Sequence, residues 1–169
     1  YDNLRKNLPT WEEVRDAPEE LIIELVKTAG LAKQKGPAIQ NALRAITEAR
    51  GSIELDFLKT LSSQEASDWL VNLKGVGPKT AAIVLLFALD MPAFPVDTHV
   101  FRVTGRLGIR PPKMTPNKAH TFLAEQFKPE TYYPVHLNLI RLGREICKAR
   151  NPLCENCPLM DICFYYANQ

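Results

Sequence analysis

The segment LKGVGPKTA at residues 73–81 places two glycines and a proline between two stretches of helix-forming residues. Glycine adopts backbone conformations that other residues avoid, and proline suits the first position of a helix because its missing N–H would be unpaired there anyway. The pattern therefore predicts a helix, a tight turn and a second helix over residues 69–89. Gly75 and Gly77 allow a bulky ligand to approach the backbone, and the amides that open the second helix can hold a phosphate. A tight turn that serves packing alone is the alternative.

Lys79 and Asp97 are the candidate reactive residues near this turn. Lys79 falls in the first turn of the second helix, where the positive end of the helix dipole disfavours an ammonium charge. A neutral amine is the form that attacks carbon and forms a Schiff base. Asp97 follows 18 residues later and precedes another expected helix, which it can cap with one oxygen while the other stays available. A solvated lysine and a purely structural cap are the alternatives.

Hydrophobic periodicity predicts an all-α fold, because no stretch alternates in the manner of a strand. Thr10 and Glu13 have the capping-box pattern and open a helical segment that ends at Gly30. Ser63 opens a later helix, and either Asp97 or Thr98 opens another. The remaining expected helices cover residues 36–50, 55–61, 63–73, 98–107, 115–127 and 134–147.

The composition describes a folded chain, with 169 residues of which 46% are apolar and 24% are charged. These values argue against disorder, collagen and simple repeats. The longest apolar run, residues 81–89, is too short to span a membrane, and no signal peptide is visible, so we expect an intracellular protein. Residues 1–73 carry 9 Lys/Arg against 12 Asp/Glu, whereas residues 74–169 carry 12 against 7. The basic second half favours contact with a polyanion.

All four cysteines lie within 17 residues near the C-terminus, with six, two and five residues between successive members: Cys147, Cys154, Cys157 and Cys163. A cluster this local is unsuited to a disulfide framework for the whole chain and can close around one metal centre. Only one C-x2-C pair is present, which favours a [4Fe–4S] cluster over zinc. Arg141, Arg144, Lys148 and Arg150 lie around the cysteines and are candidate phosphate contacts; a solvated basic face is the alternative.

Three motifs together resemble the endonuclease III family of helix-hairpin-helix DNA glycosylases. They are the hairpin at residues 73–81, the segment VDTHVFRV at residues 96–103 and the four-cysteine pattern. The resemblance extends loosely over the whole chain. It implies two helical lobes, residues 1–93 and 94–169, with a DNA-binding cleft between them and a [4Fe–4S] cluster in the second. The family's first long helices, one of which carries a glutamine that enters the DNA stack, are expected to be missing.

The same resemblance implies roles for individual residues. Lys79 matches the family's nucleophilic lysine, Asp97 its essential carboxylate, and Leu31 its wedge residue, which fills the gap left by a flipped base. Lys74 stands where the family usually has proline and adds a positive charge near the expected phosphate. The expected DNA contacts are Leu31, Lys35, Lys74, Gly75, Gly77, His99, Arg102, Arg144, Lys148 and Arg150.

The implied activity is base excision repair by a monomeric, bifunctional DNA glycosylase and AP lyase. Such an enzyme acts on duplex DNA containing damaged bases, here oxidised pyrimidines, or abasic sites. Two alternatives remain. A non-catalytic DNA-binding module would use the hairpin and the metal centre without chemistry at Lys79. A monofunctional glycosylase of the same superfamily would be expected to carry Ser or Tyr at that position.

Overall fold

The computed structural model describes all residues 1–169 and contains helices and turns but no strand, which confirms the all-α fold. Its contacts divide the chain into two compact units, Tyr1–Gly77 and Pro78–Gln169. We expected the division at residues 93 and 94. It lies earlier because the helical residues after Pro78 contact the helices at residues 116–126 and 132–145. The two lobes that the family resemblance implies stay a prediction. None of the helices has the length and apolar character needed to cross a membrane.

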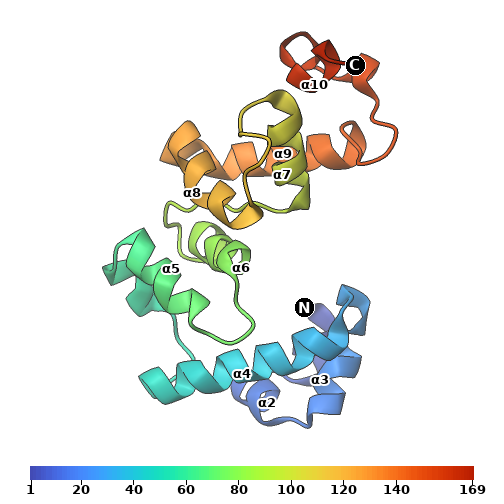
Figure 1. The fold of residues 1–169 in the computed structure, drawn as a ribbon. Helices are drawn as coiled ribbons and strands as arrows, with labels where there is room; N and C mark the ends of the chain where they lie inside the picture. Colours follow the sequence, from blue (N-terminus) through green and yellow to red (C-terminus); the bar gives the residue numbers. More distant parts are fainter. The chain divides into compact units, whose positions relative to one another are not determined.

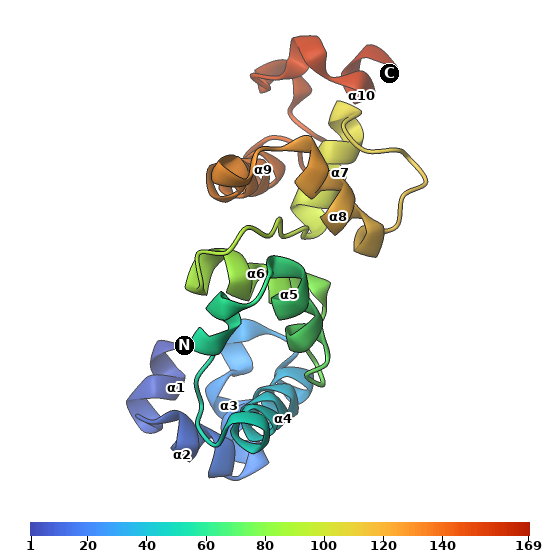
Figure 2. The same cartoon turned by 90° about the vertical axis from the view of Figure 1, so that its left-hand side faces the viewer.

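The first unit is built around one long helix. Helices α2 and α3 pack against α4, and α1 contacts α3 (Figures 1 and 2). Apolar side chains from all four meet in the core: Leu4, Val14, Ile22, Leu25 and Leu43. The α-helices are α1 (Asp2–Asn7), α2 (Trp11–Asp16), α3 (Glu19–Leu25), α4 (Ala32–Arg50) and α5 (Ser63–Val71); the short 3-10 helices are η1 (Lys27–Ala29) and η2 (Asp56–Thr60).

Local start and stop signals explain most of these boundaries. The capping box of Thr10 and Glu13 is confirmed, but α2 is short because Pro18 separates it from α3. The expected segment ending at Gly30 is therefore two α-helices and a 3-10 turn. Helix α5 begins one residue after Ser62, which forms a capping box with Glu65; the expected cap at Ser63 was wrong by one position.

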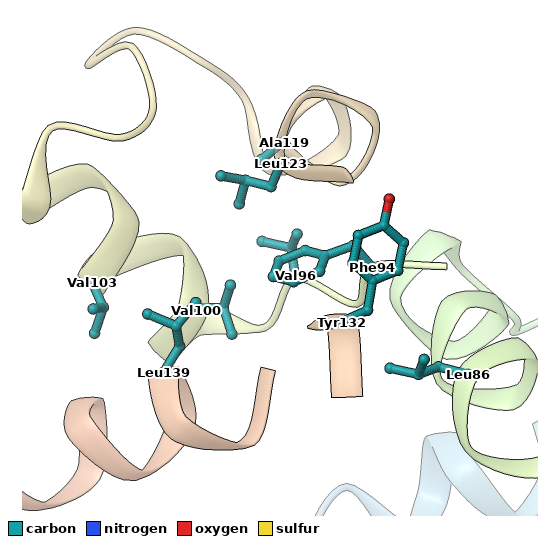
Figure 3. Packing of buried hydrophobic residues seen from close by; sticks show 9 residues of the cluster. All are labelled: Leu86, Phe94, Val96, Val100, Val103, Ala119, Leu123, Tyr132 and Leu139. Atoms are coloured by element: carbon teal, nitrogen blue, oxygen red, sulfur yellow. The ribbon is translucent and has the colours of Figure 1, made fainter. Parts of the chain in front are cut away.

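The second unit packs α7 against α9, with α8 covering the same core (Figure 1). Figure 3 shows the buried side chains of this core, which come from α7, α8, α9, the segment before α7 and the end of the hairpin's second helix. The elements are α6 (Pro78–Ile83), the π-helical η3 (Val84–Ala88), α7 (Thr98–Leu107), α8 (Pro116–Gln126), η4 (Pro129–Thr131), α9 (Tyr132–Glu145), η5 (Cys154–Asn156), η6 (Met160–Ile162) and α10 (Phe164–Ala167).

Candidate active site

Lys79 and Asp97 lie on one pocket of the second unit, although 17 residues separate them in the chain. The end of the segment before α7 and the first turn of α7 form much of the wall. The lining residues are Lys79, Val96, Asp97, Thr98, His99, Phe101, Pro116 and Arg144. The structure therefore brings four of the predicted site residues together: Lys79, Asp97, His99 and Arg144.

Lys79 is the second residue of α6, and its side chain is exposed. Its amine makes no hydrogen bond and no ion pair, although several other lysines do, such as Lys27 with Glu24 and Lys59 with Asp56. The surroundings therefore leave the Lys79 amine free to meet a ligand.

Asp97 is half-buried and caps α7. Its Oδ1 accepts a hydrogen bond of 2.7 Å from the backbone N–H of Val100. Its other carboxylate oxygen accepts no hydrogen bond from the protein, so only one of the two oxygens is used for the cap. The cap and a chemical role are thus compatible in one side chain.

His99 and Arg102 connect α7 to α9. Arg102 donates from Nε to the carbonyl oxygen of Cys147 at 3.0 Å and from Nη2 to that of Gly143 at 2.8 Å. The same Nη2 lies 3.1 Å from His99 Nδ1. Because a guanidinium only donates, His99 Nδ1 accepts, and a neutral His99 carries its hydrogen on Nε2. Arg102 is therefore engaged with backbone carbonyls, and its contact with DNA stays a prediction.

The remaining cationic side chains of the second unit differ in whether they are free to contact a phosphate. Arg144, Lys148 and Arg150 are exposed and form no ion pair, and Arg144 reaches the pocket of Lys79. Arg141 instead pairs with Glu145 on the next turn of α9, at 3.1 Å. Arg144, Lys148 and Arg150 are therefore better candidates for phosphate contacts than Arg141.

The hairpin turn uses its two glycines differently. Gly75 has φ +92°, and a Cβ there would lie 2.7 Å from Cβ of Ala38 in α4, so both conformation and space require glycine. A Cβ on Gly77 would meet no atom within 4 Å, so the backbone at Gly77 is open to a ligand. Lys74 is exposed beside them.

The expected wedge residue stands out on the surface of the first unit. Leu31 is 69% exposed and adopts a left-handed conformation, φ 53°, at the start of α4. Lys35 donates from Nζ to the carbonyl oxygen of Ala29 and so braces the loop that holds Leu31. An exposed leucine in a conformation that leucine avoids suggests a role outside the fold.

The four cysteines line a single cavity, and none forms a disulfide. Apolar side chains from α7 and α9, among them Val103, Leu107 and Leu142, make up much of the wall. Zinc would require sulfur atoms about 3.8 Å apart, since each Zn–S bond is about 2.3 Å. No three His, Cys, Asp or Glu side chains are placed to hold one metal ion. Four cysteine sulfurs around one cavity are a donor set that suits an iron–sulfur cluster.

Arg106 is a neighbour of the cysteines that the sequence analysis missed. Its Nη1 donates to Cys147 Sγ at 3.4 Å and to the Lys148 carbonyl oxygen at 2.7 Å, while its own carbonyl accepts from Cys163 Sγ at 3.5 Å. Hydrogen bonds to ligand sulfurs tune iron–sulfur centres. Its position in the sequence, one helical turn after Arg102, could have indicated that Arg106 lies on the same face of α7.

Comparison with protein families gives two matches. Residues 1–129 match the family model described as "HhH-GPD superfamily base excision DNA repair protein". Residues 147–163 match the "Iron-sulfur binding domain of endonuclease III", and this span begins and ends on the outer cysteines. The match confirms the iron–sulfur cofactor and agrees with the cavity that the four cysteines share.

Individual proteins extend the similarity to nearly the whole chain. Endonuclease III of Sulfolobus acidocaldarius is 33% identical over 93% of this chain and 68% of its own length. Endonuclease III of Thermotoga maritima is 35% identical over 93% and 69%, respectively. This chain thus spans about two thirds of each relative.

Solved structures show the same fold. A non-covalent endonuclease III–DNA complex superposes with a TM-score of 0.83 at 30% identity, covering 99% of this chain and 74% of that one. A thermostable thymine-DNA glycosylase gives 0.82 at 25% identity, covering 100% and 75%.

Proposed function

Because the chain belongs to the HhH-GPD superfamily of base excision DNA repair proteins, we propose that it is a bifunctional glycosylase and AP lyase for oxidised pyrimidines in duplex DNA. The observation that carries this proposal is the pocket shared by an unpaired Lys79 amine and an Asp97 carboxylate with one unused oxygen. A binding module has no need of that pair. This chain covers only about two thirds of each relative, so the activity of the relatives is carried over to it here as a proposal.

The first chemical step requires the damaged nucleotide outside the helix. A stacked base hides its sugar carbon, so the nucleotide rotates into the enzyme, and damaged or mispaired bases cost less to extrude. Leu31 fills the gap in the stack, while Lys74 and the backbone at Gly77 hold phosphates without reading sequence. Arg144, Lys148 and Arg150 add phosphate contacts in the second unit.

Lys79 then acts as the nucleophile. Its neutral Nζ forms a bond to C1′ as the glycosidic bond breaks, and the bonding electrons leave with the base, which takes up a proton. Asp97 accepts the proton that the amine loses, directly or through water, and stabilises the positive charge that develops on the sugar. After ring opening the adduct is a Schiff base. Loss of a 2′ hydrogen then breaks the C3′–O bond and cuts the strand on the 3′ side.

The four cysteines would hold the iron–sulfur cluster between α7, α9 and the C-terminal turns. When bound, the cluster supplies bonds that stabilise a segment with only short helices and few buried residues. The exposed Lys148 and Arg150 lie in the loop between Cys147 and Cys154. Cysteines bound to a cluster would hold the ends of this loop, and Lys148 and Arg150 would then be presented to DNA phosphates.

Borohydride trapping tests the nucleophile directly. Reduction of the Schiff base leaves a permanent cross-link between protein and DNA containing an abasic site or thymine glycol. We expect wild type to trap and Lys79→Ala to lose the cross-link. Lys113→Ala is the matched control, because Lys113 is exposed, forms no ion pair and lies outside the pocket. Undiminished trapping by Lys79→Ala would exclude Lys79 as the nucleophile.

The same assay separates the alternatives. Release of a damaged base without trapping or strand cutting indicates a monofunctional glycosylase. Binding without release or cutting indicates a non-catalytic module. Either result would overturn the proposal of lyase activity.

A further inference from the structure

The segment at residues 92–96, which leads directly into Asp97, is mostly buried although it is not helical. Phe94, Pro95 and Val96 are all buried. Two of its five residues, Pro92 and Pro95, have no N–H, and none of its backbone groups is hydrogen-bonded to another backbone group. Buried carbonyl groups without partners are costly, so this segment needs partners from side chains.

Two histidines supply those partners from two different helices. His136 of α9 is 2% exposed and places Nδ1 at 2.9 Å from the carbonyl oxygen of Pro95. His120 of α8 places Nδ1 at 3.3 Å from that of Phe94. A carbonyl only accepts, so each ring carries a hydrogen on Nδ1 and donates it. These are the only hydrogen bonds in the structure that involve residues 92–96.

The rings are held in place by packing as well. The His136 ring meets Phe87 edge-on at 5.7 Å between centroids and Phe94 at 6.5 Å. Burial lowers the pKa of both histidines, and the charge of Asp97 raises the pKa of His136 while that of Lys79 lowers it. His136 does not line the pocket of Lys79 and Asp97.

We propose that His120 and His136 are positioning residues that fix the carboxylate of Asp97 by holding the two carbonyls just before it. The proposal rests on the proposed function. The hydrogen bond from His136 ends two residues before Asp97, and the cap to Val100 fixes the carboxylate from the other side. A catalytic group displaced by about 1 Å commonly loses on the order of a hundredfold in rate. Neither histidine touches DNA in this proposal.

Variants of His136 provide the test. His136→Leu removes the donor, whereas His136→Asn keeps an N–H near the position of Nδ1, and His136→Gln moves it away. We expect the single-turnover excision rate at saturating DNA to fall about tenfold or more in the Leu and Gln variants, with DNA affinity unchanged. His136→Asn should recover most of that rate. His120→Leu should show a smaller loss, because its hydrogen bond is longer.

Tyr132→Phe is the matched control. It removes one hydrogen bond of the same core, from the Tyr132 hydroxyl to the Ala124 carbonyl oxygen at 2.7 Å, but none to residues 92–96. We expect it to lower the thermal midpoint and to leave the excision rate unchanged. Equal rate losses in Tyr132→Phe and His136→Leu would show a general packing effect and overturn the proposal. A folded His136→Leu or His136→Gln with the wild-type rate would also overturn it.

A second measurement does not depend on activity. If His136 positions Asp97, the losses of thermal midpoint in His136→Leu, which removes the donor, in Asp97→Ala and in the double variant should not add, whereas independent sites add. Should the wild type excise no base, the proposed function fails while this cycle still tests the positioning. Additive losses together with a wild-type rate in the His136 variants would refute the positioning role and leave the proposed function standing.

Discussion

At the scale of single residues, Asp97 caps α7 with the same carboxylate to which we assign a chemical task in the proposed function. Its Oδ1 caps α7, and its other oxygen is unused by the protein. The sequence predicted the cap because aspartate before Thr-His-Val-Phe is a strong N-cap signal, whereas the chemical task was implied by the family resemblance. Only the structure shows that the cap uses one oxygen and leaves the other without a protein partner.

Two substitutions at this position separate the tasks. Asparagine caps helices about as well as aspartate, whereas alanine loses about 1 kcal/mol. We therefore expect Asp97→Asn to keep the wild-type free energy of unfolding in urea and Asp97→Ala to lose about that amount. Both variants should lose base excision by orders of magnitude in single-turnover assays, because neither retains a carboxylate. Excision by Asp97→Asn at the wild-type rate would remove the carboxylate from the mechanism.

At the scale of elements, the contact between α7 and α9 sets the wall of the pocket. Gly143 is buried in α9 at the point where α7 crosses it. A Cβ there would lie 2.9 Å from His99 Cβ and 3.1 Å from His99 Nδ1. The helix pair therefore packs closely because residue 143 has no side chain, and this closeness allows Arg102 to reach the Gly143 carbonyl oxygen.

Gly143→Ala should destabilise the protein. Alanine favours a helix by about 1 kcal/mol over glycine, but the clash with His99 forces the helices apart at a cost of roughly 1–3 kcal/mol. We expect a net loss in the free energy of unfolding and a lower excision rate, since His99 shifts with the helix. Asn138→Ala, on an exposed turn of the same helix, is the control and should change stability little. A Gly143→Ala protein more stable than wild type would contradict this account of the packing.

At the scale of the whole molecule, the buried His136 and the half-buried His120 are expected to make stability depend on pH. Burial lowers the pKa of His120 and His136 below the ordinary value of 6.5. As pH falls below about 6.5, the unfolded chain binds protons at these positions that the folded chain does not bind. Protonation thus favours unfolding, and the folded state loses stability from about pH 6.5 downward until the folded histidines titrate.

Urea unfolding between pH 7.5 and 5 checks this expectation. Each histidine contributes a slope of at most about 1.4 kcal/mol per pH unit in that window. The His136→Asn variant should show a shallower slope than wild type, because asparagine does not titrate. A slope that is unchanged in this variant would show that other groups cause the acid sensitivity.

Local signals in the sequence were enough to predict the hairpin, the cap at Asp97 and the end of α7 at Gly108. Each depends on residues within one or two turns of one another, whose preferences act wherever the chain goes. The same locality explains the errors. Apolar periodicity predicted one continuous helical segment, but Pro18 separates α2 from α3. The spacing of apolar residues does not show where a helix is interrupted.

The sequence by itself determined the all-α class and the iron–sulfur motif, because helix periodicity and cysteine spacing are short-range properties. Only the tertiary structure decided how Arg102 and Arg106 are used and which partners the carbonyls of Phe94 and Pro95 find. Those contacts join residues between 26 and 45 positions apart. They follow from the way that packed helices exclude water and force each buried polar group to find a partner, a condition that no local pattern records.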